Sequence, residues 1–69
     1  MAAIDIVVNG ETRQIPHEVS LEQLLHIFSL PDQRVAIELN GKVIRKTNWH
    51  QTVVRNRDKI EVVHFVGGG

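Results

Sequence analysis

The stretch most suggestive of a chemical function is the run of three glycines that closes the sequence, Gly67, Gly68 and Gly69. Glycine brings no side chain to a core and loses the most backbone freedom on folding, so three in succession add nothing to a fold. They would place a terminal α-carboxylate on a stem narrow enough to thread into a partner's nucleotide pocket. A carboxylate, with a pKa of about 3.5, is a poor acyl donor until it is activated. Coupling to AMP and displacement by a sulfur nucleophile would convert it into a thiocarboxylate, whereas a frayed end without function is the alternative.

The other groups that could do chemistry are dispersed along the chain. The four histidines fall in separate predicted elements, and no pair has the spacing that zinc sites use. These histidines are His17, His26, His50 and His64. The acidic residues show no clustering, and a domain of 69 residues leaves little room for a catalytic cleft. We therefore expect no metal site and no catalysis by this chain alone.

Composition narrows the classes of protein further. A chain of 69 residues is one domain that buries only about 60% of the surface exposed by its unfolded chain. It has no cysteine, which excludes disulfides and thiolate zinc sites and fits a reducing compartment, so we expect a cytoplasmic protein. Eight basic residues balance eight acidic ones, which argues against nucleic acid as a partner. No segment approaches the roughly 20 apolar residues of a membrane span, and no signal peptide is recognisable at the start.

The N-terminal part predicts a β-hairpin. Strands are expected over Ile4–Val8 and Glu11–Ile15, since the first is rich in β-branched residues and the pair is joined by Asn9-Gly10. That dipeptide favours a type I′ turn, which needs φ > 0 at both central positions. Alternation with period two places Ile4, Ile6 and Val8 on the face toward the core.

One amphipathic helix follows the hairpin. Ser20 is a good N-cap, and Gln23 three residues later completes the capping-box pattern. Apolar residues recur at i, i+3, i+4 and i+7, which defines one buried face. These residues are Leu21, Leu24, Leu25 and Phe28. Pro31 ends the pattern, because the residue before a proline resists the α conformation.

The C-terminal half predicts a second hairpin and a last strand. Asn40-Gly41 repeats the turn signal, and Asn56–Asp58 marks a further turn. The expected strands are Arg34–Leu39, Lys42–Arg45 and Lys59–His64. The stretch Lys46–Thr52 is polar apart from Trp49, which predicts an irregular segment whose tryptophan covers the core.

This order of elements predicts an α+β fold. Two hairpins around one helix suit a mixed sheet of about five strands wrapped over that helix, the β-grasp or ubiquitin-like arrangement. We expect a β-grasp domain over residues 1–64 and a flexible, glycine-rich tail over residues 65–69. An extended tail from Phe65 to Gly69 would reach about 16 Å at roughly 3.3 Å per residue.

The chain also resembles a known family from Ile4 to its end. The matching features are Ile6–Gly10, Leu21–Phe28, Val35–Ile44, Trp49, Asp58–Val62 and Val66–Gly69. Their order, spacing and length together are similar to those of the ThiS family, the small sulfur carrier proteins of thiamin biosynthesis. No single feature is specific, since Asn-Gly turns occur in many proteins.

The resemblance implies a role for each tail residue. Gly69 would carry the adenylate and then the thiocarboxylate that donates sulfur for thiazole formation, while Gly67 and Gly68 enter partner active sites. Phe65 and Val66 are candidates for partner docking, and the alternative is that Phe65 packs under the sheet edge. The implied partners are an E1-like adenylating enzyme that uses ATP and magnesium, a cysteine desulfurase system and thiazole synthase. The chain would be a carrier rather than an enzyme, would bind no cofactor itself, and would be a monomer when free.

Two other functions fit the same fold. The small subunit of molybdopterin synthase shares the Gly-Gly end and the activation chemistry, but tends to be longer between the helix and the third strand. A ubiquitin-like interaction module or protein modifier would have no sulfur role. The chain also departs from the family pattern with Arg57-Asp58 in place of Gly-Asp and Arg45 in place of a proline. The first departure predicts that Asn56 takes the position with φ > 0 in the last turn.

Overall fold

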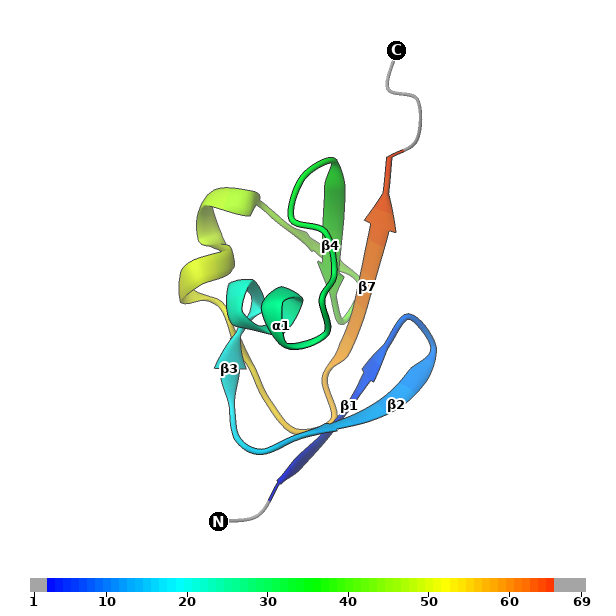
Figure 1. Cartoon of the computed structure of the whole chain (residues 1–69), viewed down its shortest axis with the longest axis vertical. Helices are drawn as coiled ribbons and strands as arrows, with labels where there is room; N and C mark the ends of the chain where they lie inside the picture. Colours follow the sequence, from blue (N-terminus) through cyan, green and yellow to red (C-terminus); the bar gives the residue numbers. More distant parts are fainter. Residues whose placement is uncertain (1–2, 66–69) are drawn as a thin grey trace.

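Five strands form one mixed sheet in the order β2-β1-β7-β4-β5 in the computed structural model, which describes residues 3–65 (Figure 1). The strands are β1 (Ile4–Val8), β2 (Glu11–Ile15), β4 (Val35–Leu39), β5 (Lys42–Ile44) and β7 (Lys59–His64). The central pair β1–β7 is parallel, and the other neighbours are antiparallel. The predicted mixed sheet of about five strands over one helix is confirmed, and its topology is that of a β-grasp fold.

Helix α1 (Leu21–Ile27) lies across one face of this sheet (Figure 1). The capping box is present: Gln23 N–H donates to Ser20 Oγ at 3.1 Å, and Ser20 N–H donates to Gln23 Oε1 at 3.0 Å. These two bonds satisfy donors that the first turn leaves without intrahelical partners. The predicted apolar face is buried as expected, with Leu21, Leu24 and Leu25 in the core.

Both Asn-Gly turns have the predicted backbone. Asn9 and Gly10 have φ of 50° and 82°, and Asn40 and Gly41 have φ of 53° and 87°. The asparagine side chains also hold β7: Asn9 Oδ1 accepts from Val62 N–H at 2.7 Å, and Asn40 Oδ1 accepts from Lys59 N–H at 2.9 Å. Each turn therefore closes its own hairpin and also fixes the last strand.

The polar stretch after β5 is more regular than predicted. Lys46–Gln51 forms the 3₁₀ helix η1, where an irregular segment was expected. Trp49 does cover the core, since it is 3% exposed and its Nε1–H donates to the Ile44 carbonyl at 2.9 Å. One hydrogen bond thus lets the indole bury its ring while its polar atom stays satisfied.

A second, two-stranded sheet was not predicted. β3 (Val19–Ser20) pairs antiparallel with β6 (Val53–Val54), and Leu21 N–H donates to the Thr52 carbonyl at 2.9 Å. This pairing joins the start of α1 to the end of η1. Both β3 and η1 contact α1.

The core lies between the large sheet and α1. Trp49 of η1 and the small-sheet residues Val19 and Val54 are also part of it. Every side chain classed as buried among residues 3–65 is apolar. The buried residues are Ile6, Val8, Ile15, Val19, Leu21, Leu24, Leu25, Ile37, Trp49, Val54 and Ile60. Ile6 and Val8 occupy the predicted face of β1.

Three local predictions are corrected. The position with φ > 0 in the last turn is Arg57, at 71°, and not Asn56. The reason is that the turn binds β1 twice: Asn56 Oδ1 accepts from Asp5 N–H at 2.8 Å, and Arg57 N–H donates to the Asp5 carbonyl at 2.6 Å. Arg34, with φ of 58°, precedes β4 instead of starting it, and Arg45 follows β5 as the N-cap of η1.

Candidate functional site

β7 carries the chain from the centre of the sheet toward the predicted tail (Figure 1). β4 flanks the strand on one side from Ile60 to His64. On the other side, β1 pairs only with Lys59 and Ile60. Beyond the strand, Phe65 N–H still donates to the Arg34 carbonyl at 2.7 Å. The chain therefore leaves the domain in an extended form, held on the β4 side alone.

Apolar side chains are exposed where β7 ends. Val63 is 47% exposed and Phe65 is 53% exposed, and both lie on the sheet face opposite α1, because Ile60 and Val62 point to the core. We call Val63 and Phe65 the exit patch. The exposure of Phe65 rules out the alternative that it packs under the sheet edge. Val63 was not singled out from the sequence. Alternation along the last strand places Val63 on the same outer face as Glu61, and an apolar residue on that face was a signal that could have identified it.

An acidic pair borders the exit patch. Glu38 on β4 lies directly opposite Glu61 on β7, on the same outer face as Val63. Like charges in directly opposite positions repel, and Glu61 is partly compensated by Lys59, whose Nζ lies 3.7 Å from Glu61 Oε1. The outer face next to the tail thus combines apolar and negatively charged groups.

The remaining predicted site residues lie outside the described residues. These are Val66, Gly67, Gly68 and Gly69. What the structure places is the strand from which they continue.

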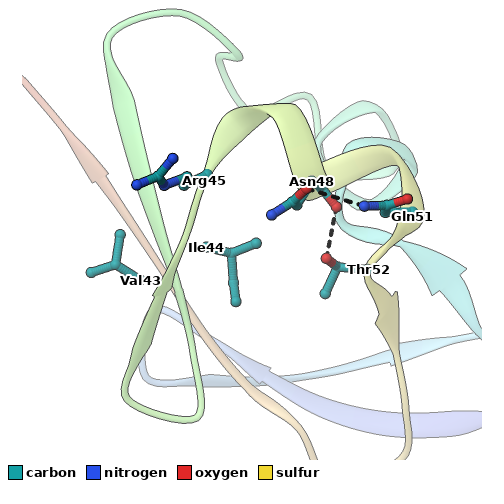
Figure 2. A pocket seen from close by; sticks show the side chains of 6 residues that line it. All are labelled: Val43, Ile44, Arg45, Asn48, Gln51 and Thr52. Carbon is teal, nitrogen blue, oxygen red and sulfur yellow. Dashed lines mark hydrogen bonds between the residues drawn. The ribbon is translucent and has the colours of Figure 1, made fainter.

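A depression of about 520 Å³ lies between β5 and η1 (Figure 2). It is lined by Val43, Ile44, Arg45, Asn48, Gln51 and Thr52. Its polar groups bond mainly to one another: Gln51 Nε2–H donates to Asn48 Oδ1 at 3.1 Å, and Thr52 Oγ–H donates to the Asn48 carbonyl at 2.7 Å. The lining includes no carboxylate or histidine, so it offers no acid–base pair.

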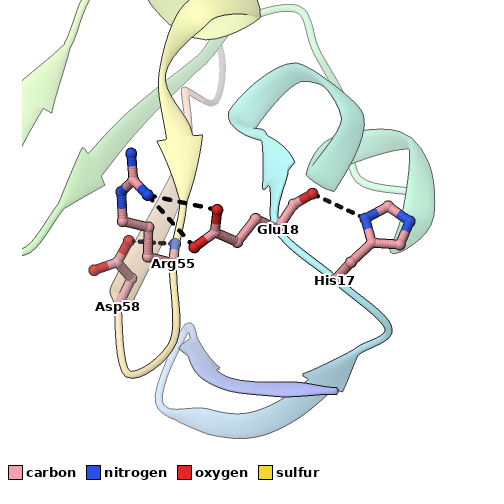
Figure 3. A network of polar contacts seen from close by, with 4 residues as sticks. All are labelled: His17, Glu18, Arg55 and Asp58. Atoms are coloured by element: carbon pink, nitrogen blue, oxygen red, sulfur yellow. Dashed lines mark hydrogen bonds and ion pairs between the residues drawn. The ribbon is translucent and has the colours of Figure 1, made fainter. Parts of the chain in front are cut away.

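A second polar cluster stabilises the turn before β7 (Figure 3). Arg55 N–H donates to Asp58 Oδ2 at 2.8 Å, and Arg55 Nη1 lies 3.4 Å from Glu18 Oε2. His17 Nδ1 lies 2.9 Å from the Glu18 carbonyl oxygen. The Arg55–Glu18 pair is exposed and so contributes little to stability, whereas the Asp58 bond caps the turn. The cluster has a structural role.

Neither clustered ligands nor a membrane span is found in the described part. Within residues 3–65, no three histidine, cysteine or carboxylate side chains gather in a way that could hold a metal ion. No helix in that range has the length and apolarity needed to cross a bilayer.

Comparison with known proteins was made for sequence and for fold. The model of the ThiS family matches residues 6–69. The sulfur carrier protein ThiS of Bacillus subtilis is 40% identical over 50 residues, which cover 72% of this chain and 76% of that protein. The thiamine biosynthesis protein (ThiS) of Geobacter metallireducens has a crystal structure that matches with a TM-score of 0.85 at 28% identity, covering 96% of this chain and all of that one.

One further relative is much longer than this chain. The thiazole synthase of Paramagnetospirillum magneticum is 36% identical over 64 residues, which cover 93% of this chain but 20% of that protein. A segment similar to nearly all of this chain therefore occurs within a single polypeptide named thiazole synthase.

Proposed function

The chain belongs to the ThiS family of sulfur carrier proteins in thiamin biosynthesis, and from this we propose that it carries sulfur as a thiocarboxylate on Gly69. The observation that carries the proposal is the exposed end of the central strand. β7 ends at His64, and both Val63 and Phe65, the last residue described, are exposed there. The chain thus reaches the surface at Phe65, and a partner could approach this end without any change in the core.

The proposed chemistry has two steps, both in the active site of a partner. A carboxylate oxygen of Gly69 attacks the α-phosphorus of ATP, and pyrophosphate leaves. Sulfide then attacks the acyl carbon, and AMP leaves with the electron pair of the broken C–O bond. ATP and magnesium belong to an E1-like adenylating enzyme. A cysteine desulfurase system supplies the sulfur as a persulfide, and two thiols reduce it to the level of sulfide as they are oxidised to a disulfide. Without such activation the carboxylate, an anion at neutral pH, would not accept a nucleophile.

The fold contributes the delivery of the tail. Residues 66–69 reach about 13 Å when fully extended, at roughly 3.3 Å per residue. Gly67 and Gly68 have no side chain to obstruct a narrow entrance. A partner that acts on Gly69 must therefore come close to Phe65, and the exit patch with Val66 is the proposed docking surface. The adjacent Glu38 and Glu61 favour a partner surface that is both apolar and basic.

Thiazole synthase is the proposed acceptor of the sulfur. Support comes from the thiazole synthase that contains a segment similar to this chain, since fusion keeps a carrier and its acceptor at high effective concentration. The thiocarboxylate sulfur of Gly69 would be transferred during thiazole formation. The chain, released as the carboxylate, would then return to the adenylating enzyme. It acts as a co-substrate and not as a catalyst.

The test is the intact mass of the chain after incubation with an E1-like adenylating enzyme, ATP, magnesium and sulfide. We expect a gain equal to the replacement of one oxygen by sulfur, located at Gly69 and absent without ATP. The enzyme's own sulfur carrier serves as the positive control. No gain beside an active control would contradict the proposal and favour a ubiquitin-like binding module.

A further inference from the structure

The large sheet is incomplete beside the second half of β7. β7 has neighbours on both sides at Ile60, but only β4 flanks it from Val62 onward, since the register of β1 ends at Val8 opposite Ile60. From this asymmetry we infer that the open edge at Val62 and His64 receives an extended strand of the enzyme that activates Gly69. The inference rests on the proposed function and adds the element through which the two proteins join.

The hydrogen bonds show where pairing with β1 ends. Val7 N–H donates to the Asp58 carbonyl at 3.0 Å, and Asn9 N–H donates to the Ile60 carbonyl at 2.9 Å. One step further, Val62 N–H donates to the Asn9 side chain, which substitutes for a strand. Even-numbered residues of β7 therefore face β1, and odd-numbered ones face β4.

His64 is the first position on this edge whose N–H has no hydrogen-bond partner within residues 3–65. Within residues 3–65, no strand or turn supplies a partner for its N–H and C=O groups. The next residue differs, because Phe65 N–H is bonded to the Arg34 carbonyl. The open edge thus offers one donor at His64 and two acceptors, the carbonyls of Val62 and His64. An unpaired row of this kind is a template for an added strand.

The outer edges of the sheet are protected in a way that this edge is not. β2 has charged Glu11 and Arg13, and β5 begins with Lys42, which are usual means of discouraging strand addition. The segment Val62–His64 has no lysine, no proline and no acidic residue. It is also next to the exit patch, which would lie under or beside an added strand.

The length of the tail identifies the occupant. Four residues that reach about 13 Å cannot present Gly69 to an active site unless that enzyme contacts the end of β7. A strand of the enzyme paired with Val62 and His64 would hold the tail extended and fix its direction. Backbone pairing supplies this alignment whatever side chains the partner strand bears.

The first test is amide hydrogen exchange measured by NMR. The free chain is compared with its complex with the E1-like adenylating enzyme, and ATP is absent from both samples. In the free chain, we expect rapid exchange at His64 N–H and slower exchange at Phe65 N–H. In the complex, exchange at His64 should slow by at least about tenfold. Unchanged exchange at His64 in a complex that still produces thiocarboxylate would overturn this inference and leave the proposed function intact. Protection that instead rises with the concentration of the free chain would assign the edge to a second copy, which also overturns it.

The second test removes the donor at the open edge. His64→Pro deletes an N–H that β4 does not use, so the fold should persist. We expect the kcat/KM of adenylation to fall by at least about tenfold, the equivalent of about 1.4 kcal/mol. His64→Ala loses the imidazole but keeps the N–H, so its kcat/KM should exceed that of His64→Pro by about fivefold or more.

A proline on the opposite edge is the matched control. Thr12 on β2 lies between hydrogen-bonded pairs of the hairpin, so its N–H points away from β1. Thr12→Pro should leave the kcat/KM of adenylation within about twofold of the parent chain, since it changes an edge remote from the tail. Equal kcat/KM values for the two proline variants would contradict the inference.

Discussion

The two halves of β7 belong to different environments. Ile60 lies between β1 and β4, and its side chain is fully buried. Val63 and Phe65, a few residues later, are about half exposed, and only β4 flanks the backbone there. One strand of six residues thus passes through the core at Ile60 and ends at the surface.

This difference separates stability from function along a single strand. The first half is fixed by core packing and by pairing on both sides, so changes there should unfold the domain. The second half contributes little buried apolar area, so changes there should affect partners while the fold persists. A carrier needs both properties, because its body has to stay folded while its end is transferred between active sites.

The largest expected effect comes from deleting Gly69. The truncated chain should show no gain of sulfur mass at all, since the acyl carbon at the correct distance from the body is lost. Its unfolding midpoint in denaturant should equal that of the parent chain, because residues 66–69 follow the last strand. A truncated chain that loses cooperative unfolding would show that the tail supports the fold. That result would contradict the separation of stability from function along β7.

Leu25→Ala tests the buried core, the first of the two environments compared. Leu25 is 2% exposed on the buried face of α1, and its truncation should lower the free energy of unfolding by about 2 to 5 kcal/mol. The control is Val63→Ala on the outer face, with an expected loss below about 0.5 kcal/mol. Chemical denaturation followed by circular dichroism measures both. Similar losses for the two variants would mean that the end of β7 is part of the core.

Much of this architecture could be predicted because its signals are local. The Asn-Gly turns, the capping box at Ser20 and the alternation in β1 depend on neighbours within a few residues. The pairing of Val19 with Val54 was missed because it joins distant two-residue segments without a pattern of their own. The φ > 0 position moved to Arg57 for the same reason, since contacts with Asp5 on β1 determine that turn.

The candidate site was predictable in part. Its chemistry at Gly69 and the candidate Phe65 could be proposed from the sequence, and the structure adds the exposure of Phe65. The open edge at His64 could not be predicted. It depends on where β1 ends relative to β7 in a parallel register, and that register joins residues about 50 positions apart. Long-range pairing of this kind leaves no periodic trace in one sequence.

Phe65→Ala tests the surface end of the comparison with a moderate effect. The kcat/KM of adenylation should fall by about tenfold if Phe65 anchors the docked enzyme, as aromatic residues often do in interfaces. The free energy of unfolding should stay within about 0.5 kcal/mol of the parent value, because the side chain is half exposed. Ile27→Ala on α1 is the matched control, since Ile27 is similarly exposed but lies outside the exit patch. An equal loss of kcat/KM in both variants would argue against specific docking at Phe65.

The smallest expected effect concerns the turn that leads into β7. Arg57 has φ of 71°, a region that costs a residue with a Cβ roughly 1 to 2 kcal/mol and costs glycine nothing. Arg57→Gly should therefore raise the free energy of unfolding by about 0.5 to 1 kcal/mol after the entropy lost by glycine is subtracted. Arg57→Ala keeps the penalty and should bring no gain. Asn56→Gly should destabilise the domain, because it removes the acceptor for Asp5 N–H. A gain in Asn56→Gly and none in Arg57→Gly would return the strained position to Asn56. Because this turn anchors only the first half of β7, none of the three variants should change the rate of sulfur loading.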